Sequence, residues 1–154
     1  MKLEILDEDS YKIFINDDYI KQIDINNKED LSNNIKSIIV KIKKVYDIIL
    51  EGFYEVHVYP INNIGLILEI KNIDSYLSKR IDLRIIVHNE EEMYIKFSRY
   101  ELIKKYNNIK YLNNYFYLNV NEINKKDKYH LIEFANIIYG DDLLEVKRQW
   151  HNLT

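Results

Sequence analysis

The stretch LEGFYEVHVYPINNIGLILEIK, residues Leu50–Lys71, decides the fold of this chain. Apolar and polar residues alternate on both sides of Asn62–Asn63, which predicts strands at Phe53–Ile61 and Ile64–Asn72. Asparagine tolerates the left-handed backbone that a tight turn requires, so the two strands are expected to form an antiparallel hairpin. Gly52 stands where a preceding helix would end.

The first of these strands has one apolar and one polar face, because residues two apart in a strand point to the same side. The apolar face, with Tyr54, Val56 and Val58, is predicted to be the core, and Glu55 and His57 share the other face. One interpretation makes Glu55 and His57 an acid–base pair, which also needs a nucleophile or an oxyanion-stabilising group nearby. The sequence identifies no such partner, so a solvated strand face is preferred, with His57 as a protein-contact candidate.

The elements before this hairpin complete a ββαββ order. Alternation over residues 2–6 and 11–16, around the acidic run DEDS, predicts an opening hairpin. Asn27 precedes acidic residues and begins a predicted helix that ends among lysines, as the helix dipole favours. Its apolar residues recur at spacings of three and four and form one stripe: Leu31, Ile35, Ile38, Ile42, Val45 and Ile49.

The second half of the chain is predicted from weaker patterns. Residues 73–80 lose the alternation and indicate a connector. Residues 81–88 and 93–97 predict a hairpin, residues 99–106 a short helix or turn, and Ile109–Leu112 with Tyr115–Val120 another hairpin. Lys128–Tyr139 predicts a helix with Gly140 as its C-cap, followed by a final helix at Leu143–Trp150.

These elements predict an α+β fold of antiparallel β-hairpins with helices packed on one face. The order divides the chain into a ββαββ subdomain at residues 1–72, a connector at 73–80, and a β-rich subdomain with C-terminal helices at 81–154. Two small similar subdomains and one compact domain both fit this order.

The composition excludes several classes of function. The 154 residues include 47% hydrophobic and 31% charged residues, which is typical of a globular domain. The net charge of −3 offers no overall positive field for nucleic acid. The absence of cysteine excludes disulfides and thiolate chemistry. The amino terminus lacks a signal-peptide pattern and no segment is apolar enough to span a membrane, so a cytoplasmic protein without a membrane contact is expected.

No pattern for a cofactor, a metal or a catalytic centre is found. GxGxxG, GxxxxGK, GxSxG and HExxH are absent, and the chain has only three glycines. His88 precedes three glutamates, but no second histidine lies at the short spacing of a chelating pair. We therefore expect a protein with no cofactor and no bound metal.

Aromatic residues near the carboxy terminus are candidates for contacts with another protein. Tyrosine buries a large rigid surface and keeps one polar end, and it is enriched where proteins touch proteins. The candidates are Tyr111, Tyr115, Tyr117 and Trp150, and a place in the core is the alternative for each of them.

Several stretches resemble the MecA family of adaptor proteins, which deliver client proteins to the Clp-type AAA+ unfoldase ClpC. The opening MKLEILDEDSYKIFINDDYI and the hairpin EGFYEVHVYPINNIGLILEI resemble the amino-terminal part of that family. The segments MYIKFSRYELIKKY, IKYLNNYFYLNV and HLIEFANIIYG follow the order of its carboxy-terminal domain. The chain departs from the family in being shorter, in lacking a long acidic linker, and in having a strand at 81–88.

The resemblance implies a non-enzymatic protein-binding adaptor or regulatory module with no catalytic residue. Its amino-terminal half would contact a client and its carboxy-terminal half an AAA+ unfoldase, with the tyrosine hairpin Tyr111–Tyr117 as the partner surface by position. Two alternatives stay open. One is a structural or assembly subunit of a larger complex, and the other is a small enzyme that uses Glu55, His57 or His88. The sequence does not fix the oligomeric state.

Overall fold

The computed structural model describes residues 2–16, 26–46, 52–61, 65–74, 81–132 and 136–152. The described residues divide into two compact units, the first ending at Asn89 and the second beginning at Glu90. Each unit has its own sheet, in which antiparallel pairing predominates, and the predicted α+β class is confirmed. The units are described separately below.

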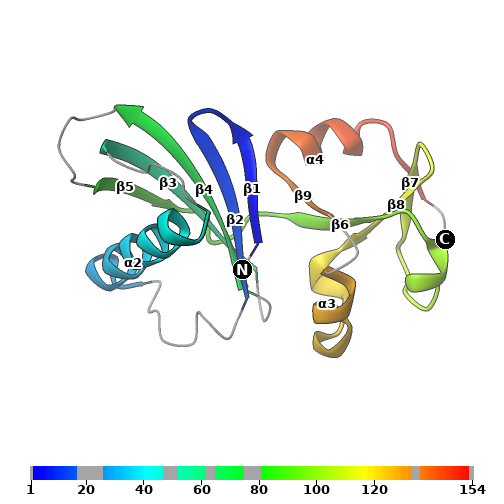
Figure 1. The fold of residues 1–154 in the computed structure, drawn as a ribbon. Helices are drawn as coiled ribbons and strands as arrows, with labels where there is room; N and C mark the ends of the chain where they lie inside the picture. Colours follow the sequence, from blue (N-terminus) through cyan, green and yellow to red (C-terminus); the bar gives the residue numbers. More distant parts are fainter. Residues whose placement is uncertain are drawn as a thin grey trace. The chain divides into compact units, whose positions relative to one another are not determined.

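The first unit is built on a five-stranded sheet with the order β1-β2-β4-β3-β5 (Figure 1). Its strands are β1 (Lys2–Asp7), β2 (Ser10–Asn16), β3 (Gly52–Ile61), β4 (Gly65–Asp74) and β5 (Ile81–Val87). The predicted pairings of β1 with β2 and of β3 with β4 are confirmed as antiparallel. The Asn62–Asn63 turn lies outside the described residues.

Helix α2 (Lys28–Tyr46) covers one face of this sheet (Figure 1). It begins as predicted, because the Asn27 Oδ1 atom accepts a hydrogen bond from the Asp30 backbone N–H at 3.2 Å. Its stripe packs on the core face of the sheet through the buried residues Leu31, Ile35, Ile38, Ile39 and Ile42. Val45 was predicted to belong to the buried stripe, but it is 68% exposed. Ile49, which was predicted to belong to the same stripe, lies outside the described residues.

Gly65 marks a close approach between β4 and β2. It stands opposite Asn16 in the register, and a Cβ atom at this position would lie 2.0 Å from the Ile15 carbonyl oxygen. A side chain is excluded there by backbone atoms, which cannot move aside without breaking the ladder. The glycine is therefore required where β4 begins.

Strand β5 is the main departure from the predicted topology. The predicted hairpin of residues 81–88 with 93–97 is wrong, because β5 pairs in parallel with β3. This register places the apolar side chains of β5 on the core that α2 covers: Ile81, Leu83, Ile85 and Val87. The burial of that face stabilises the parallel pairing by more than a hairpin with residues 93–97 would gain from its short loop. The division between the units consequently falls after Asn89, whereas the sequence placed it at the connector 73–80.

The second unit has a five-stranded antiparallel sheet with the order β10-β7-β8-β6-β9. Its strands are β6 (Met93–Phe97), β7 (Lys110–Leu112), β8 (Tyr115–Asn119), β9 (Asn136–Tyr139) and β10 (His151–Asn152). Its helices are the 3₁₀ turns η1 (Tyr100–Leu102) and η2 (Val120–Glu122), α3 (Lys125–Ile132) and α4 (Gly140–Lys147). The predicted β7–β8 hairpin is confirmed, and Asn113 and Asn114 have φ values of 51° and 68° at its turn.

The carboxy-terminal elements differ from the prediction. The helix predicted over Lys128–Tyr139 is wrong at its carboxy-terminal end, since Asn136–Tyr139 forms the edge strand β9 against β6. The β-branched pair Ile137–Ile138 fits this half-buried edge. Gly140 has a φ of +60° and begins α4, so it is not the C-cap of the preceding helix. The final helix ends at Lys147, and Trp150 lies beyond it.

Candidate functional site

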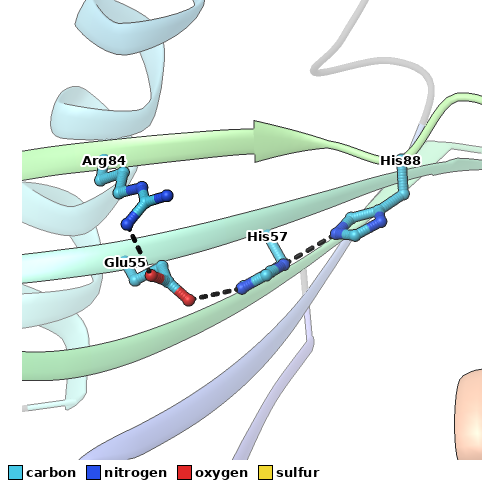
Figure 2. A network of polar contacts seen from close by, with 4 residues as sticks. All are labelled: Glu55, His57, Arg84 and His88. Carbon is cyan, nitrogen blue, oxygen red and sulfur yellow. Dashed lines mark hydrogen bonds and ion pairs between the residues drawn. The ribbon is translucent and has the colours of Figure 1, made fainter.

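A network of polar side chains lies on the face of the first sheet that is opposite α2 (Figure 2). Glu55 and His57 project from β3, Arg84 projects from β5, and His88 follows the end of β5. The parallel pairing of β3 and β5 brings these residues together, because Glu55 stands beside Arg84 and His57 beside Ile86. The residues Glu55, His57 and His88 are called the Glu–His–His chain below.

The three residues of the Glu–His–His chain are joined end to end. His57 Nε2 lies 2.8 Å from Glu55 Oε1, and His57 Nδ1 lies 2.7 Å from His88 Nε2. Both distances are those of good hydrogen bonds. Arg84 Nη1 lies 3.8 Å from the other carboxylate oxygen of Glu55, Oε2. Both nitrogens of the His57 ring therefore have a partner, as Figure 2 shows.

The carboxylate fixes the direction of these hydrogen bonds. An ionised Glu55 only accepts, so His57 donates to it from Nε2. In a neutral His57 the other nitrogen, Nδ1, then carries no proton and accepts from His88 Nε2–H. The arrangement is a directed chain from His88 through His57 to Glu55, and it can hold one additional proton without losing either contact.

The surroundings of Glu55 favour the ionised form of its carboxyl group. The hydrogen bond from His57 lowers the pKa of Glu55, and the charges of His57, Arg84 and Lys71 act in the same direction, against the opposing effect of burial. The side chains of His57 and Glu55 are 28% and 27% exposed, so they are reached by solvent. Both side chains therefore stand at the surface of the sheet, and the lowered pKa of Glu55 favours its ionised form.

Aromatic stacking and a backbone bond hold His88 in place. Its ring lies on that of Tyr59, with 4.4 Å between the centroids and 7° between the planes. The His88 backbone N–H donates to the Val58 carbonyl oxygen at 2.8 Å, which extends the pairing of β5 with β3 by one step. His88 is therefore positioned by β3 on three sides, through Tyr59, His57 and the backbone.

The partnership of His57 with His88 was missed by sequence reasoning, which looked for a second histidine at short spacing. The two residues are 31 positions apart and meet only because β5 pairs with β3. The available signal was the shared pattern of the two strands, since residues 81–87 alternate and are apolar like residues 53–59. That signal would have required the parallel register to be known.

The other predicted contact residues lie in the second unit and do not share one surface. Tyr117 is 3% exposed and belongs to a core cluster with Tyr94 and Leu143. Trp150 packs on that cluster, with its ring 5.9 Å from the ring of Tyr117. Tyr115 is 40% exposed, and Lys96 Nζ lies 3.9 Å from the centre of its ring. Tyr111 stands opposite Phe116 in the register, on the other face of the hairpin.

Three aromatic rings form a partly exposed surface on that other face, called the aromatic patch below. Phe116 lies between Tyr100 and Tyr111, with ring centroids 5.4 Å and 5.3 Å apart and tilted planes. Tyr100, in η1, is 37% exposed, and the other two rings are half-buried. Tyr111 donates its hydroxyl hydrogen to Asn114 Oδ1 at 3.0 Å, which fixes the ring. Rigid rings with polar ends are typical of protein-contact surfaces.

Comparisons with known proteins do not assign the chain to a family. Searches of protein-family models, of curated proteins and of solved structures found no match to the chain. Across the residues that the structure describes, no group of three or more histidine, aspartate or glutamate side chains is arranged to hold a metal ion. None of the described helices is both long and apolar enough to cross a membrane.

Proposed function

We propose that the chain is a non-enzymatic adaptor that binds a client protein through its first unit and a Clp-type AAA+ unfoldase through its second. The proposal joins the resemblance of the sequence to MecA-type adaptors with the division of the chain into two compact units. A bridging protein needs two separate surfaces, and each unit has its own sheet and its own buried cluster. Cytoplasmic localisation and the absence of catalysis are part of the proposal.

The observation that carries this proposal is the aromatic patch. Tyr100 exposes more than a third of its surface beside the half-buried Phe116 and Tyr111. Aromatic anchors of this kind contribute most of the binding free energy of many interfaces. We therefore assign the unfoldase contact to the aromatic patch and not to Tyr117, whose ring is buried beneath Trp150.

The test is recovery of partners from a native lysate with the intact, tagged chain as bait. We expect an AAA+ unfoldase to be recovered, and we expect Tyr100→Ala to weaken its binding about tenfold, as the loss of a contact residue worth about 1.4 kcal/mol predicts. The matched control is Tyr46→Ala, which removes an exposed tyrosine from α2 in the first unit. It should leave the unfoldase affinity unchanged.

Two outcomes would contradict the adaptor function. Recovery of one fixed large assembly in place of an unfoldase would favour the structural subunit. Equal loss of unfoldase binding in the Tyr46 and Tyr100 variants would remove the aromatic patch from the contact. Sedimentation separates the alternatives further, because an adaptor with an accessible patch sediments as a monomer or as an exchanging species, whereas a permanent oligomer that covers Tyr100 does not.

A further inference from the structure

We propose that the contact between His57 and His88 is a pH switch that fastens the end of β5 to β3 at neutral pH and releases it on acidification. The inference does not depend on the identity of any partner. It follows from the number of protons that the Glu–His–His chain can hold. It also follows from the backbone hydrogen bond and the ring contact by which His88 holds the end of β5 against β3.

The contact between the two rings tolerates at most one proton beyond the neutral pair. Two nitrogens 2.7 Å apart need a hydrogen atom on one side and a lone pair on the other. The neutral pair satisfies this, and so does a pair that has taken up one proton. When both imidazoles are charged, His57 Nδ1–H faces His88 Nε2–H, and two positive charges stand in contact. The rings must then separate.

The neighbouring carboxylates of Glu55 and Glu69 favour the first of these protons, and the positive charge that it adds opposes the second. Ionised Glu55 stabilises a positive His57, and this leaves His88 facing a cation. The groups that face the pair come from every neighbouring strand: Glu55 and Tyr59 on β3, Glu69 and Lys71 on β4, Lys12 on β2 and Arg84 on β5. Arg84 and Lys71 add positive charge near Glu55. Imidazole is the side chain whose charge changes between neutral and mildly acidic conditions, so acidification supplies the second proton.

Release of His88 would affect the end of β5 and the residues that follow it. Its backbone bond to Val58 lies one residue past the end of β5, and its stacking on Tyr59 is a side-chain contact of the same residue. The next residues, Asn89 and Glu90, are where the first compact unit gives way to the second. Acidification is therefore expected to loosen the first residues of the segment that leads into the second unit, while the core beneath α2 stays intact.

A metal ion between the two histidines is the competing interpretation, and the ring geometry disfavours it. The ring centroids are 5.0 Å apart with 21° between the planes, although the nitrogens are only 2.7 Å apart. The rings therefore meet edge to edge, with the two nitrogens aimed at each other and not at a common third point. A shared proton fits that line.

The experiment measures hydrogen-exchange protection of the His88 amide in the full chain at pH 7.5 and pH 5.0, corrected for the intrinsic exchange rate. We expect protection of His88 to fall about tenfold at pH 5.0, the effect of losing one fastened hydrogen bond. The amide of Leu68, in the central strand β4, serves as the internal reference and should keep its protection. In His57→Leu the His88 amide should be weakly protected at both pH values.

The matched control is His151→Gln, which removes an exposed histidine of the second unit and should keep the response of His88. Several results would overturn the switch. Protection of His88 that is equal at both pH values is one, and an equal loss at Leu68, which signals global unfolding, is another. A pH response that persists in His57→Leu would also overturn it. So would protection at pH 7.5 that is lost with EDTA and regained with Zn²⁺, because that result assigns the contact to a metal.

Discussion

In the second unit, polar contacts of a single aspartate link a turn to a helix. Asp127 lies at the start of α3, where its Oδ2 atom is 2.6 Å from Lys105 Nζ and accepts the hydroxyl hydrogen of Tyr106. These contacts lower the pKa of Asp127 from 3.8 to about 2, with the hydrogen bond from Lys105 as the largest cause. Burial, together with the bond to Asp127, raises the pKa of Tyr106 to about 12. Asp127 thus joins the turn after η1 to helix α3.

Asp127→Asn is expected to lower the melting temperature of the second unit near neutral pH. The folded-state pKa of Asp127 is below its ordinary value, so its stabilisation is complete above about pH 4 and is lost as the pH falls towards about 2. The difference in stability between the two proteins should therefore shrink over that range, in a series of thermal melts. Glu145→Gln, at an exposed position of α4, is the control. A difference that stays constant from pH 7 to pH 2 would show that the carboxylate charge is not involved.

At the scale of elements, a close backbone approach governs how β4 begins. Gly65→Ala is expected to destabilise the first unit by about 3 kcal/mol or more, because the added Cβ would meet the Ile15 carbonyl oxygen at 2.0 Å. Gly140→Ala is the matched substitution, since φ is +60° there and nothing lies within 4 Å of the added atom. It should cost about 1 kcal/mol through backbone strain alone. Denaturant unfolding measures both values, and equal losses would contradict the role given to Gly65.

The elements that sequence reasoning predicted are those decided by neighbouring residues. The Asn27 cap of α2, the alternation of β3 and the turn at Asn113–Asn114 depend on a few adjacent positions. Strand β9 was predicted as helix because Leu131, Phe134 and Ile138 also fit a helical spacing. The free edge of β6, which no local pattern reveals, decided in favour of a strand.

At the scale of the whole molecule, one pairing determines both the unit boundary and the candidate site. The parallel contact of β5 with β3 adds residues 81–87 to the first unit and brings His88 to His57. No turn signal marks a parallel pair, because its strands are joined by a crossover and not by a hairpin. The face that bears His57 was therefore predicted correctly, whereas its partner was not.

The most direct test of the site is the protonation pattern of the two imidazoles, measured through the ¹⁵N chemical shifts of their ring nitrogens. At pH 7.5 we predict that the neutral form of His57 carries its proton on Nε2, next to Glu55, and leaves Nδ1 to accept from His88 Nε2–H. Glu55→Gln, which removes the charge and keeps the size, should weaken this preference. A His57 that carries its neutral proton on Nδ1, or a His88 that is unaffected by loss of the His57 ring, would contradict the account.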